Sequence, residues 1–182
     1  NRCPHVWHVR EFVHEDMYAE FDFGKWFVRR VALANLQLAI YNSDSVRDKF
    51  LAYFGSHRNT VIWNGVTSPL SHQRHRVREI VASSYVNLCM VSSLHRGKGH
   101  ENAIDALPLI IDTYRNCRLH IVGDGDDGYR QTLERRAYQL GVSEHIVWIG
   151  FSIDPREIIY QADVFLMCSS MEAFGRVTVE AL

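Results

Sequence analysis

The sequence predicts an α/β protein with parallel sheets, and three observations in its second half support this fold class. Short apolar runs alternate with helical patterns over residues 86–182. The runs are continuously apolar, which is typical of strands that are buried on both faces of a sheet. Each run ends in glycine or serine before the next helical pattern begins. Strand–helix units in series indicate a parallel sheet that is covered by helices on both faces.

Four strands and four helices are expected in this half. The strands are predicted at residues 86–91, 118–123, 145–150 and 163–170. The helices are predicted at residues 100–114, 129–141, 154–162 and 174–182. Gly141 is a C-terminal cap signal for the second helix. Asp154 is the expected N-cap of the third helix, with Pro155 at its first helical position.

The first half is less regular and resembles the end of another α/β domain. Strands are predicted at residues 5–12, 38–41 and 59–66, and helices at residues 26–37 and 47–55. Residues 67–84 are polar, serine-rich and weakly patterned, which favours a linker. The sequence therefore predicts the end of one domain in residues 1–66, a linker in residues 67–84 and a second domain in residues 85–182.

Composition indicates an ordinary globular protein. The chain has 182 residues, of which 47% are hydrophobic and 23% charged, and its formal net charge is −1. This balance gives no general attraction to nucleic acid or to a membrane surface. The longest apolar stretch, "VALANLQLAIY", is too short to span a membrane. Because the chain starts without methionine and stops within a helical pattern, we expect an internal fragment of a longer protein.

Cysteines and histidines give no sign of a metal site. The four cysteines form no C-x-x-C pair, and buried free thiols in a reducing cytoplasm are expected. The close histidine pairs "HVWH" and "HQRH" lack neighbouring acidic or cysteine ligands. We therefore expect solvated or hydrogen-bonded histidines and no bound metal.

Ligands of open α/β sheets bind beyond the carboxyl ends of the strands, so the loops there are the candidate sites. After the first strand, Lys98 stands between Gly97 and Gly99 where a helix begins. Glycines let the backbone approach an anion, and the start of a helix favours negative charge. This pattern predicts a phosphate contact by Lys98, with Arg96 as a weaker companion. The alternative is a solvated surface lysine.

The second loop, "GDGDDG", matches the dinucleotide-binding pattern G-x-G-x-x-G at Gly123, Gly125 and Gly128. Its three aspartates would repel a pyrophosphate, and a tight turn near a ligand explains the glycines equally well. After the third strand, Gly150 and Phe151 are candidates for one wall of a nucleobase pocket. A turn glycine and a core phenylalanine are the alternative.

The fourth loop, "SSMEAFGRVTVE", places two glutamates around the start of a helix. Glu172 lies in the loop, and Phe174 and Gly175 begin the helix, where backbone N–H groups lack partners. Glu180 lies too far into the helix to cap these donors, and its apolar neighbours indicate partial burial. A buried carboxylate needs hydrogen-bond donors, and sugar hydroxyls would supply them.

These segments resemble the retaining glycosyltransferases of family 4. "IVGDG", "VWIGF", "YQADVFLMCSS" and "EAFGRVTVEAL" occur in the order found in that family, after a "KG" that follows the first strand. The resemblance is strongest over residues 86–182, and "PHVWHVREF" and "VIWNGV" fit the end of the family's N-terminal domain. It implies the GT-B fold of two Rossmann-like domains with parallel sheets, of which the first is incomplete here.

The resemblance also implies roles for single residues. Glu172 would contact the donor sugar, and Phe174 and Gly175 would offer backbone amides to sugar and phosphate. Glu180 would hold the ribose hydroxyls, and Lys98 would bind the diphosphate as leaving group. Lys98 and Glu172 are therefore the catalytic candidates. The donor-binding candidates are Ser93, Arg96, Lys98, Gly123, Gly150, Phe151, Glu172, Phe174, Gly175 and Glu180.

Two points qualify this assignment. Many members carry an arginine five residues before the lysine, where this chain has Ser93. The diphosphate would then lose one cation, for which Arg96 could compensate, or Ser93 could donate a single weaker hydrogen bond. Arg10 and Glu11, at the end of a predicted strand, are candidates for the acceptor-side cleft, and a buried ion pair is the alternative.

The resemblance implies metal-independent transfer of a sugar from a nucleoside-diphosphate sugar to a saccharide or lipid-linked acceptor, with retention at the anomeric carbon, in polysaccharide biosynthesis. It implies no cofactor, no nucleic-acid partner and a cytoplasmic location, and it leaves open a peripheral association with the inner face of a membrane through other parts of the protein. Two alternatives remain. They are an NAD-type oxidoreductase, based on "GDGDDG", and a fragment that binds nucleotide without activity of its own.

Overall fold

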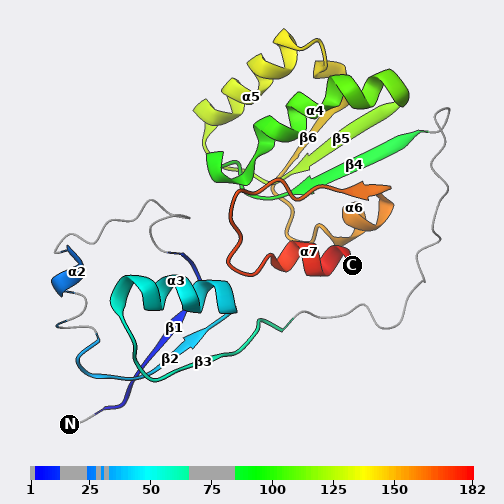
Figure 1. The fold of residues 1–182 in the computed structure, drawn as a ribbon. Helices are drawn as coiled ribbons and strands as arrows, with labels where there is room; N and C mark the ends of the chain where they lie inside the picture. The colour runs from blue at the N-terminus through cyan, green and yellow to red at the C-terminus, as the bar shows by residue number, and fades with distance from the viewer. Residues whose placement is uncertain (1–2, 13–23, 28–29, 31–32, 66–84) are drawn as a thin grey trace. The chain divides into compact units, whose positions relative to one another are not determined.

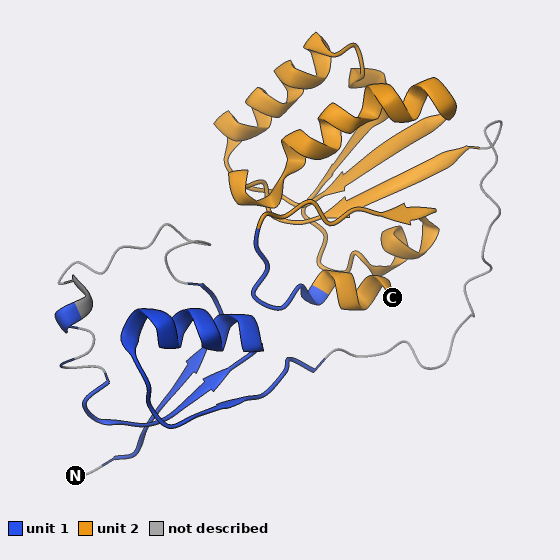
Figure 2. Cartoon of the chain, viewed as in Figure 1, with its two compact units in different colours: residues 1–66, 171–176 blue, residues 67–170, 177–182 orange. Residues whose placement is uncertain are grey.

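The structure is a computed structural model that describes residues 3–12, 24–27, 30, 33–65 and 85–182 (Figure 1). The chain divides into two compact units (Figure 2). The first unit comprises residues 1–66 and 171–176, and the second comprises residues 67–170 and 177–182. The predicted linker lies outside the described residues, so the domain boundaries remain predictions.

The second unit contains a sheet of four parallel strands in the order β6-β5-β4-β7. Its strands are β4 (Val86–Val91), β5 (Cys117–Val122), β6 (Ile146–Gly150) and β7 (Val164–Phe165). All four predicted strands are present, but the fourth has two residues where the sequence predicted eight. Its two residues pair with Leu88 and Cys89, and the Leu166 N–H donates to the Cys89 carbonyl at 2.8 Å, while β4 continues to Val91. Residues 166–170 therefore form the start of the loop that leaves β7.

Helices cover both faces of this sheet, as predicted (Figure 1). The helices are α4 (His100–Thr113), α5 (Asp127–Gln139), α6 (Arg156–Gln161) and α7 (Arg176–Ala181). Helices α4 and α5 pack on one face, where Leu107 and Leu133 are fully buried against Leu119. Each such side chain stabilises the fold by about 1.5–3 kcal/mol. Helices α6 and α7 pack on the other face, around Cys89 of β4.

The helix ends follow the capping signals of the sequence with one shift. Gly141 adopts a left-handed conformation (φ 69°) just after α5, as a C-terminal signal requires. Helix α6 begins at Arg156, one residue later than predicted, with Pro155 as its N-cap. Pro155 itself has φ −81° and ψ 0°, within the right-handed helical region, and no side chain caps the helix there. The Asp154 carboxylate still accepts the Arg156 N–H at 3.2 Å.

The first unit contains a parallel sheet in the order β1-β2-β3. The strands are β1 (His5–Val9), β2 (Leu36–Tyr41) and β3 (Asn59–Val61), and the sheet packs against α3 (Asp44–Phe54). The hydroxyl oxygen of Ser43 accepts the Val46 N–H at 3.2 Å and so caps α3. The predicted strands and the predicted helix at residues 47–55 are therefore present, with shifted ends.

The helix predicted at residues 26–37 is wrong over its second half. The described part contains a short helix, α2 (Gly24–Phe27), and a turn at residues 33–35, while Leu36 begins β2. Residues 28–29 and 31–32 lie outside the description. Pairing with β1 and β3, together with packing against α3, buries Ala39 and Tyr41 completely. This tertiary burial outweighs the helical pattern of the local sequence.

No helix within the described ranges is long and apolar enough to cross a membrane.

Candidate functional site

The strand order of the second unit creates a switch point between β4 and β7. These two strands are neighbours, yet α4 follows β4 on one face of the sheet and α7 follows β7 on the other (Figure 1). The helices that follow the two strands therefore lie on opposite faces of the sheet, which defines a switch point at its carboxyl edge. Ligands of open α/β sheets bind at such a switch point.

The loop after β4, residues 92–99, is tied to the loop after β5. Ser92 donates its N–H to the Val122 carbonyl at 3.0 Å, and Leu94 donates to the Asp124 carbonyl at 3.0 Å. The loop ends in a single 3₁₀ turn, η2 (Arg96–Lys98), which places Lys98, half-buried, one residue before the N-cap of α4. The position of Lys98 is therefore set by backbone bonds on both sides.

The same loop is tied to the chain that follows β7. The N–H and the hydroxyl of Ser170 both donate to the Gly97 carbonyl, at 3.1 and 3.2 Å. Gly99 has φ 73°, and a Cβ at this position would overlap the Cys168 carbonyl. The two loops thus meet across the switch point, with Lys98 between the two contacts.

The glycines of "GDGDDG" serve this packing. Gly123 has φ 139°, and a Cβ there would overlap the Ser92 carbonyl. Its N–H donates to the Gly150 carbonyl at 2.8 Å, so two predicted site glycines are in contact. Asp126 caps α5 by accepting the Tyr129 N–H at 2.6 Å. A carboxylate therefore occupies the helix start where a dinucleotide phosphate would bind.

The two residues that were predicted to assist Lys98 are exposed. Ser93 lies on the surface of the loop. The Arg96 guanidinium lies 5.5 Å from the centroid of the Tyr129 ring, in a cation–π arrangement. Tyr129 is itself buried, and its hydroxyl donates to the Glu101 carboxylate at 2.5 Å. The contact with Tyr129 thus holds the Arg96 side chain at the edge of the loop.

The loop after β6 is open. Phe151 is 75% exposed and Ile153 is 94% exposed. The alternative interpretation of Phe151 as a core residue is therefore wrong. An exposed aromatic ring at the carboxyl edge of the sheet is available for stacking on a planar ligand.

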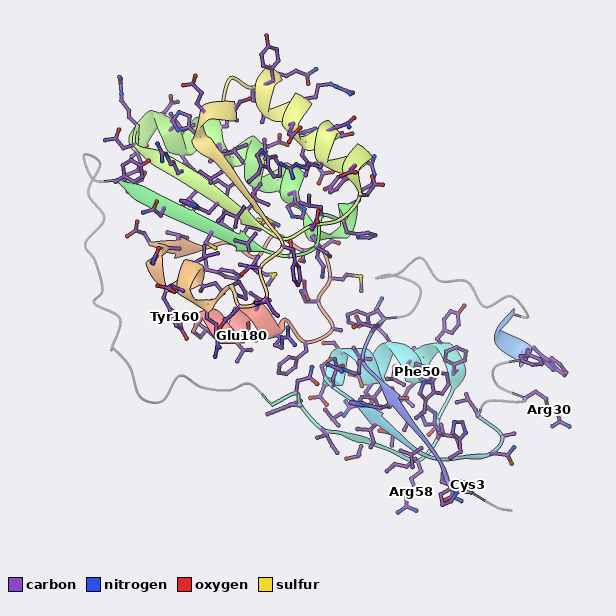
Figure 3. All side chains as sticks on the ribbon, turned by 180° about the vertical axis from the view of Figure 1, so that it is seen from behind. Cys3, Arg30, Phe50, Arg58, Tyr160 and Glu180 are labelled. Atoms are coloured by element: carbon purple, nitrogen blue, oxygen red, sulfur yellow. The ribbon has the colours of Figure 1, made fainter. Side chains whose placement is uncertain are left out.

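Glu180 lies on α7 and is half-buried, as the sequence indicated. Figure 3 labels it together with Tyr160 of α6. The pKa of the Arg156 guanidinium is raised, first by its hydrogen bond to Asp154 and further by the charges of Tyr160 and Glu180. Side chains of α6 and α7 belong to one apolar cluster around Cys89, so Glu180 is carried by a helix that packs beside α6.

The remaining predicted site residues belong to the first unit. Arg10 and Glu11 follow β1 and are exposed, so the alternative of a buried ion pair is wrong. Glu172, Phe174 and Gly175 lie in residues 171–176, and Gly175 has φ 71°. Their grouping with Lys98 and Glu180 around one ligand remains a prediction.

No group of three or more histidine, cysteine, aspartate or glutamate side chains gathers as a metal site within the described part of the chain. The pair His72 and His75 lies outside it.

Sequence reasoning missed two residues of this site. Ser170 bonds to Gly97, and His100, directly after the "KG" pair, is completely buried. A serine at the end of a strand pattern gave a weak signal for Ser170. Nothing in the local pattern around His100 indicates that its side chain faces inward.

Comparison with known proteins gives a consistent family. The model of the family described as Glycosyl transferases group 1 matches residues 73–182, more than half of the chain. The uncharacterized glycosyltransferase MJ1607 of Methanocaldococcus jannaschii is 39% identical over 97 residues, covering 52% of this chain and 24% of that protein. The putative glycosyltransferase EpsD of Bacillus subtilis is 27% identical over 158 residues, covering 83% of this chain and 41% of EpsD. The chain therefore spans less than half the length of these relatives.

The fold is similar to that of HepE from Anabaena, solved in complex with UDP and glucose. The TM-score is 0.78 at 24% sequence identity, and the match covers 99% of this chain and 50% of that chain.

Proposed function

The chain belongs to the glycosyl transferases group 1, and on this premise we propose that its second unit binds the donor, a nucleoside-diphosphate sugar. Its α/β fold with two parallel sheets is that of the GT-B glycosyltransferases over half their length. The whole protein would transfer the sugar to a saccharide or lipid-linked acceptor with retention at the anomeric carbon. The observation that carries the proposal is the contact of Ser170 with Gly97, beside Lys98, at the switch point.

The diphosphate would bind at Lys98 and the start of α4. Helix α4 has 14 residues, and its N-cap, Gly99, offers no side-chain cap. The N-terminal end of such a helix attracts an anion through its N–H groups and its dipole. Lys98 adds a full positive charge next to it. Helix α5 differs because Asp126 already caps it, so the phosphates would bind α4 and not α5.

The nucleoside and the sugar would be held by the flanking loops. Phe151 would stack on the base, and Glu180 would accept hydrogen bonds from the ribose hydroxyls. Glu172 and the amides of Phe174 and Gly175 would contact the sugar. Charge-assisted bonds to a carboxylate contribute about 1.5–3 kcal/mol each, so the two glutamates would determine much of the affinity for the donor.

Catalysis would consist mainly of stabilising the departing diphosphate. Positive charge that is fixed in place before the reaction lowers the barrier because it does not need to reorganise as negative charge develops. Lys98 would provide this charge, with Arg96 as a second cation in place of an arginine at position 93. No protein general base is assigned, and transfer would need no metal ion. Arg10 and Glu11 would face the acceptor.

The alternative of an NAD-type oxidoreductase is wrong for a member of this family. The structure supplies the physical reason for the glycine pattern that suggested it. Gly123 allows the close approach of Ser92, and Gly125 pairs with Leu94. Both glycines therefore serve contact between two loops and give no evidence for a dinucleotide.

Calorimetric titration of the chain with UDP, GDP and NADH tests the proposal. UDP comes first because the HepE structure contains it. We expect the chain to bind one of the two nucleoside diphosphates and not to bind NADH. Lys98→Ala and Glu180→Gln should each weaken the diphosphate about tenfold or more, given the usual energy of charge-assisted bonds. Binding of NADH that survives Glu180→Gln, or of a diphosphate that ignores both changes, would contradict the proposal.

A further inference from the structure

His100, the first residue of α4, is completely buried. It lies two residues after Lys98, yet solvent reaches no part of its side chain. A ligand therefore cannot touch it while the loop keeps this conformation. Any effect of His100 on the donor must pass through the residues around it.

The contacts of the imidazole run back into the loop that carries Lys98. Its Nε2 lies 3.1 Å from the hydroxyl oxygen of Ser92, the first residue after β4. Its Nδ1 makes no hydrogen bond of full geometry within the described residues, although the His95 backbone is close enough to act on its pKa. The His95 carbonyl also accepts the Lys98 N–H at 2.9 Å. The ring thus lies between the start of the loop and the turn that holds Lys98.

The ring also joins the loop to α5. The His100 and Tyr129 rings meet edge to face, with centroids 6.0 Å apart. Arg96 stacks on the ring of Tyr129, and the Glu101 carboxylate accepts a hydrogen bond from the Tyr129 hydroxyl. Two aromatic side chains therefore support the loop from behind, one from each helix on this face of the sheet.

Burial lowers the pKa of His100 from its usual value of 6.5. The negative charge of Glu101 and the His95 backbone raise this pKa in part, and the positive charge of Lys98 lowers it further. The ring is therefore neutral at neutral pH. A neutral imidazole has one donor and one acceptor nitrogen. With its proton on Nδ1, the ring can accept a hydrogen bond from the Ser92 hydroxyl at Nε2.

We propose that His100 is a positioning residue for the diphosphate of the donor. It bonds to Ser92 and packs against Tyr129, and so holds residues 92–99 in the conformation that presents Lys98. This inference rests on the proposed function, because it concerns the same ligand. A site that is already ordered before binding loses less entropy when the ligand arrives.

The first test is hydrogen exchange of the ligand-free chain. His100→Leu keeps most of the volume and removes both nitrogens, so the amides of residues 93–99 should exchange about tenfold faster than in the unaltered chain. His120→Leu is the matched control, because His120 bonds to Asn87 at 3.2 Å elsewhere in the same sheet. It should leave the exchange of residues 93–99 unchanged. Equal exchange in both variants would overturn the inference.

The second test separates positioning from general stability. His100→Leu should raise the Kd of the diphosphate about tenfold and leave the Kd of the free nucleoside unchanged. The reason is that only residues 92–99, which would bind the phosphates, become less ordered. His100→Gln, whose amide reaches toward Ser92, should recover most of the affinity. Ser92→Ala combined with His100→Leu should be non-additive, since the two side chains share one bond.

Two outcomes are then distinguishable. If the unaltered chain binds neither UDP nor GDP, the proposed function fails and the positioning role fails with it. If it binds one of them and His100→Leu lowers nucleoside and diphosphate affinity equally, only the positioning role is overturned.

Discussion

Two loops at the carboxyl edge of the same sheet differ in how firmly they are held. Residues 92–99, after β4, bond to the loop after β5 and to Ser170. Ser92 of this loop also bonds to the completely buried side chain of His100. Residues 151–155, after β6, carry Phe151 and Ile153 on the open surface. The described side-chain bonds of this loop are those that Arg156, the first residue of α6, donates to Asp154.

This difference corresponds to two kinds of recognition. A diphosphate is common to all nucleoside-diphosphate sugars, and a fixed loop suits a part of the ligand that does not vary. The base varies between donors, and an open loop with a large apolar side chain suits a part that does. On the proposed function, the loop after β4 would hold the diphosphate and the loop after β6 would stack on the base.

The largest expected effect comes from breaking the fixed loop itself. Gly99→Ala places a Cβ against the Cys168 carbonyl in a left-handed conformation. The loop must then move, so diphosphate binding should be lost and the free energy of unfolding should fall by more than about 1 kcal/mol. Gly141→Ala is the control, because it is equally left-handed (φ 69°) with no atom near the added Cβ. It should lower stability and leave binding intact, as thermal melts and calorimetry would show. Normal binding by Gly99→Ala would contradict the described contact.

The next effect comes from removing charge without moving the loop. Lys98→Ala should weaken the diphosphate by about 10- to 100-fold through loss of a charge-assisted bond. Free nucleoside should bind as before, because Lys98 would touch only phosphate. Lys98→Arg retains the charge and should recover part of the affinity. Equal losses for nucleoside and diphosphate would place Lys98 outside the phosphate site.

A smaller effect is expected in the open loop. Phe151→Ala should weaken nucleoside and diphosphate alike by about fivefold, the lower end of base–aromatic stacking, because the ring is 75% exposed. Stability should stay unchanged for the same reason. Exchanging Phe151 for leucine tests whether the aromatic face or the apolar area matters. If Phe151→Ala lowered the thermal midpoint as much as Gly99→Ala does, the loop after β6 would be as important for stability as the loop after β4, and the comparison would fail.

The smallest effect is a pH dependence of stability. The pKa of His100 is lowered by burial, so the unfolded chain binds a proton there more readily than the folded chain. The stability contributed by neutral His100 is therefore complete above about pH 6.5 and is lost as pH falls below it. Urea unfolding at several pH values should show a weaker slope for His100→Leu. The pKa of His120 is lowered too, by burial and by Arg118, so His120→Leu should also reduce the slope. An unchanged slope in His100→Leu would contradict the lowered pKa.

The sequence predicted the parts of the fold that depend on local pattern. The continuous apolar run of β4 and the helix stop at Gly141 are local signals, and both are present. The helix predicted through Leu36 was wrong because pairing between strands that are distant in sequence decides that segment. Sequence pattern does not report such pairing.

The same limit applies to the site. Lys98 between two glycines was visible in the sequence because backbone approach and helix start are adjacent along the chain. The contact of Ser170 with Gly97 joins residues that are 73 positions apart, and the burial of His100 depends on Tyr129 of another helix. A single sequence could suggest the ligand of this loop, but not how the loop is held.

The position of β7 beside β4 also bears on how the protein is made. The chain emerges from the ribosome from its N-terminus, so β4, β5 and β6 can assemble before residues 164–170 exist. The Asn87 N–H donates to the Asp163 carboxylate at 2.8 Å, and the two residues are 76 positions apart. This bond therefore cannot form until Asp163 has been synthesised. The contact of Ser170 with Gly97 comes later still. A nascent chain therefore carries Lys98 early, and residues 92–99 gain their contact with Ser170 only after 73 further residues have been translated.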